Sequence, residues 1–138
     1  MDIVPQWDQL PELTWTEKIT YLMREFLKHP QIPCPVEHLF GGGKYIREMR
    51  IPRGTLFIGR PHRHGHPIQL ISGELIWITP HGRFHKVAPD STVSAPGDQM
   101  VCYTLTDVVG RTIHSDNGER DTDMLENQIF HPVQELLT

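Results

Sequence analysis

The stretch that decides the fold lies in the middle of the chain and reads IPRGTLFIGRPHRHGHPIQLISGEL, residues 51–75. Its two ends are short runs of apolar and β-branched residues that are closed by glycine, proline or serine. Runs of this length and composition are typical of short β-strands. The stretch therefore predicts two strands joined by a loop, and this loop carries three closely spaced histidines, His62, His64 and His66.

Similar short runs continue on both sides of this stretch, and no helical pattern interrupts them between residues 36 and 114. The 11 glycines and 12 prolines of the chain supply the turns that many short strands need. Short strands that follow one another without helices predict an all-β sandwich or barrel. The predicted strands are Val36–Phe40, Lys44–Ile51, Thr55–Ile58, Gln69–Ile71, Glu74–Thr79, Arg83–Ala88, Thr92–Ser94, Met100–Leu105 and Val108–His114.

One helix is predicted before the strands. Thr14 and Glu17 have the spacing of a capping box, and Pro30 ends the pattern because proline disfavours helical backbone at the preceding residue. Apolar residues recur at helical spacing between these limits, which predicts a face that packs in the core. The residues of this face are Trp15, Ile19, Leu22, Met23, Phe26 and Leu27.

The chain is expected to have three parts. Residues 1–30 form an irregular arm, which includes Trp7 and Leu10, and then the helix, which packs on one sheet of the barrel. Residues 31–115 form the barrel itself. Residues 116–138 form a C-terminal tail or a short helix.

Composition excludes several classes of function. The formal net charge of -4 argues against a general nucleic-acid binder, and 38% hydrophobic with 22% charged residues indicates a globular protein. The chain has no apolar run long enough to span a bilayer and no N-terminal secretory signal. We therefore expect a cytoplasmic protein that binds neither nucleic acid nor membrane. Cys34 and Cys102 are expected to be reduced thiols.

The three histidines of the loop suggest a metal site. Residues two apart in an extended chain point to the same side, so His62, His64 and His66 can converge. Neutral imidazole is a common ligand of divalent transition metals, and a catalytic site needs about three protein ligands. The alternative is a polar loop whose histidines are solvated.

The segment resembles the first motif of the cupin superfamily. That motif has two histidines separated by one residue, then a glutamate, and a glycine seven residues after the glutamate. Counting back from Gly73 places His66 at the glutamate position. His62 fits the second histidine, with Arg60 at the first, or His62 and His64 are the pair with a shortened loop. The sequence leaves both alignments open.

The second cupin motif has a proline-glycine turn and a histidine three residues after the glycine. Pro96-Gly97 resembles this turn, but Met100 occupies the histidine position. His114, at the end of the last strand, can supply the missing ligand, because a jelly roll can bring that strand to the same interior. The alternative is that His114 makes only a local hydrogen bond at a strand end.

Further short motifs narrow the resemblance to a small cupin-like family encoded by tailed phages and prophages, over roughly residues 31–115. This resemblance implies the fold and a phage-type origin, but no known reaction. The motifs are Cys34-Pro-Val-Glu-His38-Leu-Phe40, the Ile-Pro-x-Gly-Thr strand, His62 with His66, the turn at 94–97, Tyr103 and Thr112-Ile-His114.

We therefore expect an all-β cupin-type double-stranded β-helix, or jelly roll, with an N-terminal helix and a short C-terminal segment. Its histidine cluster binds a divalent transition metal, such as Zn, Fe, Ni or Mn, and the barrel takes a small polar ligand. The expected metal ligands are His62, His66 and His114, with His64 as the alternative ligand. Tyr103 is a candidate general acid or base.

The sequence leaves open whether such a protein is an enzyme, and whether it would then be an isomerase, a lyase or an oxygenase. Arg47, Arg50 and Arg60 are candidate contacts for an anionic ligand, and the alternative is that these arginines are solvated at the surface. By analogy with other cupins we expect a homodimer. The alternative function is a non-catalytic homo-oligomeric binding or assembly module without metal.

Overall fold

The computed structural model describes residues 13–132 of the 138-residue chain. These residues belong to two compact units, divided between residues 32 and 33. The predicted arm with Trp7 and Leu10, and the end of the predicted tail, lie outside the described residues. Within the described part, no helix has the length and apolar character needed to cross a membrane.

The first unit contains the helix α2 (Trp15–Phe26). The Thr14 hydroxyl caps it, accepting a hydrogen bond from Glu17 N at 3.2 Å and donating one to Glu17 Oε1 at 3.0 Å. The predicted N-terminal cap is therefore present. The Glu17 carboxylate accepts its hydrogen bond from the Thr14 hydroxyl, whereas in the usual capping box it accepts from the backbone N–H of the N-cap residue.

The buried residues of α2 confirm part of the predicted apolar face. Ile19, Leu22 and Met23 are buried. Leu27 does not belong to that face, because the helix ends one residue earlier and the Leu27 side chain is exposed.

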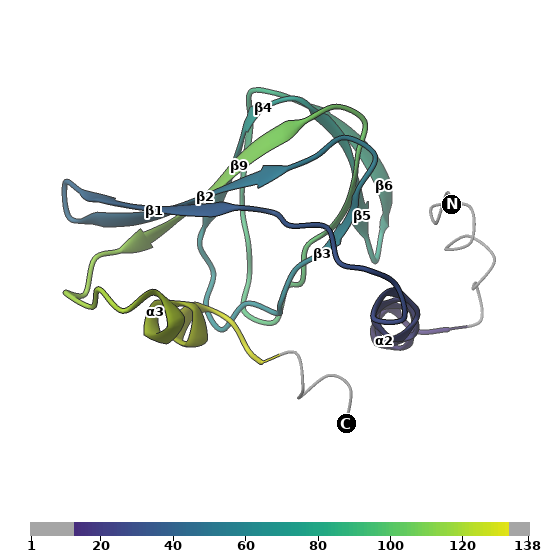
Figure 1. Cartoon of the computed structure of the whole chain (residues 1–138), viewed down its shortest axis with the longest axis horizontal. Coiled ribbons are helices and arrows are strands. Elements are labelled where there is room, and N and C mark those ends of the chain that lie inside the picture. The colour runs from purple at the N-terminus through teal and green to yellow at the C-terminus, as the bar shows by residue number, and fades with distance from the viewer. Residues whose placement is uncertain (1–12, 133–138) are drawn as a thin grey trace. The chain divides into compact units, whose positions relative to one another are not determined.

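The second unit is a barrel of two antiparallel sheets, followed by a short helix (Figure 1). The five-stranded sheet has the order β1-β2-β9-β4-β7, and the four-stranded sheet has the order β3-β8-β5-β6. Each of the nine predicted strands overlaps a strand of this unit, so the predicted all-β jelly roll is confirmed. The elements are β1 (Val36–Gly41), β2 (Lys44–Ile51), β3 (Leu56–Ile58), β4 (Pro67–Ser72), β5 (Glu74–Thr79), β6 (Gly82–Val87), β7 (Asp90–Val93), β8 (Val101–Thr104), β9 (Val108–Ser115) and α3 (Thr122–Ile129).

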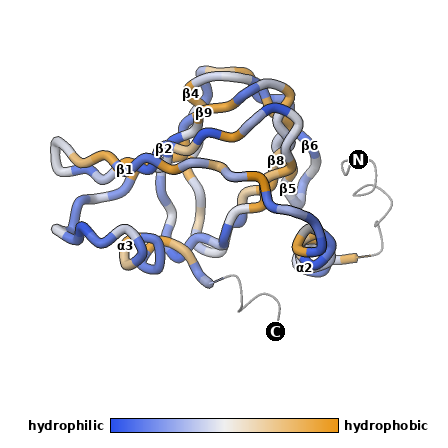
Figure 2. Tube along the Cα trace, viewed as in Figure 1, coloured by the Kyte–Doolittle hydropathy of each residue, from blue (hydrophilic) through white to orange (hydrophobic). Residues whose placement is uncertain are grey.

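The barrel interior follows from alternation along the strands, which Figure 2 shows as interleaved hydrophobic and hydrophilic positions. Successive side chains of a strand point to opposite faces, so each strand contributes every second residue to the interior. The core between the sheets contains the buried residues Ile51, Leu70, Leu75, Cys102 and Val108.

The turn between β4 and β5 requires a glycine. Gly73 has a φ of +95°, and a Cβ at this position would lie 2.3 Å from the Asp107 carbonyl oxygen. Only a residue without a side chain allows this close approach of the two turns. The turn thereby fixes the register in which β4 ends and β5 begins.

The C-terminal helix α3 closes one end of the barrel. Asp121 caps it, and its apolar side packs Leu125 and Ile129, together with the following Phe130, against Tyr45 of β2. Phe130 also forms a β-bridge with His62. The predicted C-terminal segment is thus a helix that lies against the histidine loop.

Candidate functional site

The histidine loop between β3 and β4 is fixed by backbone bonds to a distant segment. His62 N donates to the Asp98 carbonyl at 2.8 Å, and Ser94 N donates to the His66 carbonyl at 2.9 Å. Gly65 lies so close to this segment that a Cβ would be 2.5 Å from the Ser94 carbonyl oxygen. These contacts hold the loop against the barrel, and they hold His62 and His66 in buried positions.

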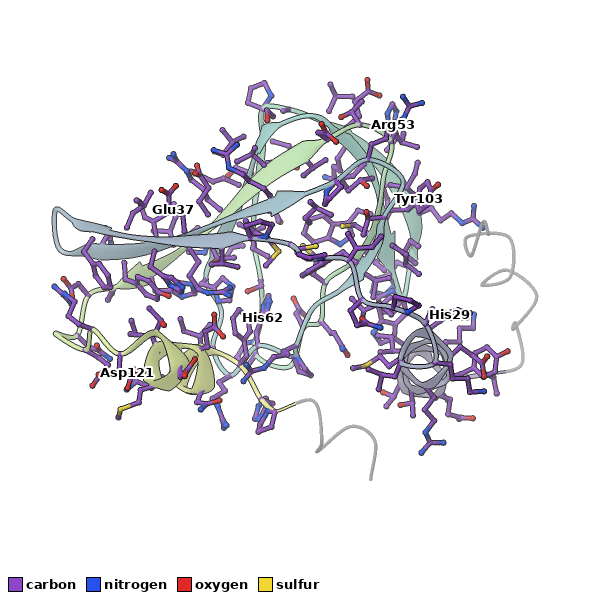
Figure 3. The ribbon with its side chains drawn as sticks, viewed as in Figure 1. His29, Glu37, Arg53, His62, Tyr103 and Asp121 are labelled. Carbon is purple, nitrogen blue, oxygen red and sulfur yellow. The ribbon has the colours of Figure 1, made fainter. Side chains whose placement is uncertain are left out.

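Three imidazoles form a continuous row at this end of the barrel. The ring centroids of His62 and His66 are 4.3 Å apart, and those of His66 and His114 are 4.4 Å apart. His62 is 4% exposed and His66 is 5% exposed. Figure 3 shows His62 in the interior, above the chain that leaves α3. His64 is exposed and does not belong to this row.

Burial makes the three imidazoles weak bases. Desolvation, with a smaller effect of the nearby His66, lowers the pKa of His62 from 6.5 to about 4. The same two causes lower the pKa of His114 to about 3, and burial lowers the pKa of His66. All three rings are therefore neutral at pH 7, which is the form that binds metals.

The donor chemistry of the row fits a metal ion, although coordination is not preformed. His62 Nδ1 and His66 Nε2 are buried and have no hydrogen-bond partner. His114 Nε2 lies 2.9 Å from the Thr112 hydroxyl, so His114 makes a local hydrogen bond near the end of β9. Among the described residues, no three His, Cys, Asp or Glu side chains are grouped as in a metal site. The fit rests on two buried nitrogens without partners.

A cavity of about 270 Å³ adjoins the row inside the barrel. His62 is part of its wall, so the cluster and the cavity share one boundary. Most of the wall is apolar and comes from the core of both sheets. Its apolar residues include Ile51, Phe57, Leu70, Leu75, Trp77 and Val108.

The cavity is polar at the end that touches the histidine row. Arg47 points inward from β2 and is 7% exposed, and its Nη2 donates to Glu126 Oε1 of α3 at 3.1 Å. Its guanidinium also lies over the Phe130 ring, 4.8 Å from the ring centroid. Arg60 lies near the same ring at 5.6 Å. This end of the cavity therefore combines two guanidinium groups, one carboxylate and a neutral imidazole.

The structure does not bring Tyr103 to this site. Cys102 lines the cavity, and the neighbouring residue of a strand points to the opposite face. The Tyr103 hydroxyl lies near Gly54, 4.0 Å from where a Cβ would be, and Figure 3 places Tyr103 well away from His62.

A second tyrosine, which the sequence analysis did not select, belongs to the row instead. Tyr45 is 1% exposed, and its ring centroid lies 5.7 Å from that of His114. Its hydroxyl lies 2.6 Å from His38 Nδ1, and burial raises the Tyr45 pKa. The alternation of side chains along a strand could have identified it, because Tyr45 lies on the same face of β2 as Arg47 and Ile51.

Comparison with solved structures shows what kind of barrel this is. One similar structure is a cupin superfamily protein from Desulfitobacterium hafniense, with a TM-score of 0.52 and 9% identity over 64% of this chain and 83% of that one. Another is a conserved protein with a double-stranded β-helix domain from Klebsiella pneumoniae, with a TM-score of 0.52 and 14% identity over 69% and 87% of the two chains. The barrel has the cupin fold.

At these identities the likeness extends to the fold alone. No protein-family model matches the chain, and no curated protein is significantly similar to it. The narrower resemblance to phage-encoded cupin-like proteins therefore stays a prediction, as does the homodimer. Within the cupin barrel, Met100 lines the cavity near Gly59 and adds to its apolar wall.

Proposed function

We propose that this cupin barrel binds a divalent transition metal through His62, His66 and His114, and that it binds a small organic molecule in the adjoining cavity. The observation that carries the metal site is the pair of buried ring nitrogens, His62 Nδ1 and His66 Nε2, that have no hydrogen-bond partner. A buried polar atom without a partner costs roughly 1–3 kcal/mol, and coordination to a metal removes this cost.

Electrostatics support the same assignment. Metal ligands must be deprotonated, and burial keeps these imidazoles neutral well below pH 7. The hydrogen bond to Thr112 orients the His114 ring through one nitrogen and leaves the other available. When bound, a divalent metal would polarise a carbonyl or lower the pKa of water at the edge of the cavity.

The chain's own residues would position the molecule. The apolar wall would contact the apolar part of the molecule, and Arg47 and Glu126 supply charged groups at the end next to His62. Phe130, which lines the cavity, is held by Arg60 and Arg63, which donate hydrogen bonds to its carbonyl at 3.2 and 3.1 Å. These residues would orient a bound molecule toward the imidazoles.

The test is the metal content of full-length protein purified without a histidine tag. We expect about one equivalent of a transition metal by elemental analysis, and a rise in melting temperature when that metal is added back to chelator-treated protein. The double variant His62→Ala, His66→Ala should lose both. The variant His81→Ala, which removes an exposed histidine in the β5–β6 turn, is the matched control and should keep both.

Protein with no stoichiometric metal, and with no metal-dependent shift in melting temperature, would refute the metal site. Equal metal content and equal metal-dependent melting shifts in the His81→Ala variant and in the double variant would also refute it. The barrel would then be a binding module without metal, which is the alternative that the sequence analysis kept open.

A further inference from the structure

We propose that the cavity binds a small apolar monocarboxylate, whose hydrocarbon part fills the core of the barrel and whose carboxylate is bound by Arg47 beside His62. This inference rests on the proposed function for the presence of a ligand in the cavity. It does not depend on the metal.

The size and lining of the cavity define the body of the ligand. About 270 Å³ corresponds to roughly nine water-sized groups, taking about 30 Å³ for each. Most of the surface of the wall is apolar and comes from aliphatic and aromatic side chains, among them Leu70, Leu75 and Trp77. A polar body such as a sugar would leave its hydroxyl groups without partners against this wall. A short alkyl chain or a single aromatic ring fits both the volume and the chemistry.

Arg47 defines the head group. It is the charged residue of a β2 face whose other members, Tyr45, Met49 and Ile51, pack in the interior. Its Nη2 is bonded to Glu126, but its Nε is buried and has no hydrogen-bond partner. A guanidinium with an unused donor at the wall of a cavity can donate a charge-assisted hydrogen bond to a carboxylate oxygen.

The charge balance of the wall favours an anion. Four cationic side chains line the cavity, and three of them have a carboxylate partner. Within the described residues, Arg60 instead donates to neutral groups, Asn127 Oδ1 and the carbonyls of Phe130 and His131. The three ion pairs are Arg47 with Glu126 at 3.1 Å, Lys86 with Asp90 at 3.4 Å, and Arg111 with Glu48 at 2.9 Å. Glu48 does not line the cavity and also pairs with Arg50 at 3.7 Å, so the wall carries a net positive charge.

The first test compares ligands of one size on the unmodified protein. Calorimetric titration at neutral pH uses hexanoate, hexanamide and hexylammonium with chelator-treated full-length chain. We expect hexanoate to bind roughly tenfold or more tightly than hexanamide, because a hydrogen bond to a charged group contributes that much. Hexylammonium should bind most weakly. Equal affinities for hexanoate and hexanamide, or no detectable binding of hexanoate at millimolar concentration, would overturn the proposal.

The second test removes the guanidinium. Arg47→Met keeps an unbranched side chain of similar length and should weaken hexanoate binding roughly ten- to a hundredfold while changing hexanamide binding little. Arg50→Met is the matched control, because Arg50 lies on the same strand with its side chain 64% exposed, and it should bind hexanoate like the unmodified protein. Unchanged hexanoate affinity in a folded Arg47→Met protein would contradict the assignment. If Arg47→Met does not fold, the ligand comparison decides alone.

The two proposals fail separately. Metal content and the effect of the double histidine variant test the metal site, whereas the calorimetry uses protein from which metal has been removed. Stoichiometric metal without hexanoate binding would overturn the carboxylate proposal only. Hexanoate binding that depends on Arg47, in protein that never holds metal, would support it and overturn the metal site.

Discussion

Lowering the pH from 7 to 5 should destabilise the metal-free barrel, because the histidine row is held neutral inside it. The pKa of His62 is about 4 in the folded barrel, below its ordinary value of 6.5. Between these two values the unfolded chain binds a proton that the folded barrel does not bind. The stability that His62 contributes is therefore present above pH 6.5, falls as the pH falls, and stops falling near pH 4.

The magnitude follows from the size of the shift. One pKa unit corresponds to about 1.4 kcal/mol, so His62 alone should reduce the free energy of unfolding by about 2 kcal/mol between pH 7 and pH 5. His114 and His66 act in the same direction, and the lowered pKa values of His62 and His114 arise partly from repulsion by neighbouring imidazoles of the row, so the contributions do not simply add. For an m-value of about 2 kcal/mol per M, this loss lowers the urea midpoint by roughly 1 M.

The assay is urea unfolding followed by circular dichroism, at pH steps from 7 to 5, in the presence of a chelator. His62→Gln replaces the imidazole by an amide that does not titrate in this range, so the variant should lose about 2 kcal/mol less than the unmodified protein over the same pH interval. His81→Gln controls for the removal of a histidine from an exposed turn. If His62→Gln and the unmodified protein lose the same stability, His62 is not a buried neutral imidazole.

Three smaller predictions concern the fold around the site. Gly73→Ala should lower the free energy of unfolding by about 1–3 kcal/mol, since the new Cβ meets the Asp107 carbonyl at 2.3 Å, and an unchanged urea midpoint would contradict that close approach. Asp121→Ala should cost about 1 kcal/mol, because it removes the side chain that caps α3; a melting temperature equal to that of the unmodified protein would argue against the cap. Burial raises the pKa of the Cys102 thiol to about 12, so in a Cys34→Ser background Ellman's reagent should react only at the rate of unfolding, and rapid reaction in native buffer would show that Cys102 is accessible.

Local patterns were sufficient to predict the strands of the barrel. β2 contributes Tyr45, Arg47 and Ile51 from alternate positions to the interior, and turn residues between the runs of β-branched and apolar residues marked the ends of the strands. The weakest prediction was the strand at Thr92–Ser94, which the structure places at Asp90–Val93. Its sequence is polar and almost without alternation, so its position is set by pairing with β4, where Thr92 lies opposite Ile68. Long-range pairing of this kind leaves no local signal.

The site was predictable only in part, for the same reason. His62 and His66 are close in the sequence, and their spacing drew attention to them. The contact between the His66 and His114 rings results from closure of the barrel. Only the family resemblance suggested that the last strand would reach the same interior. The pairing of Arg47 with Glu126 joins β2 to a C-terminal helix, and nothing in either segment indicates it. Tyr103 lies on the other face of β8 from Cys102, because one position along a strand reverses the face of a side chain.

The energetics of the barrel give a reason to expect a ligand at this end. Within the described residues, four buried side-chain polar atoms have no hydrogen-bond partner, and three of them, on Arg47, His62 and His66, gather between the cavity and the histidine row. At roughly 1–3 kcal/mol each, these atoms cost the free barrel several kcal/mol, which is a large part of the stability of a domain of this size. Apolar side chains of similar volume at these positions would avoid that cost. Functional sites commonly retain such local costs, and a cation between the imidazoles together with a carboxylate on the guanidinium would satisfy all three atoms at once.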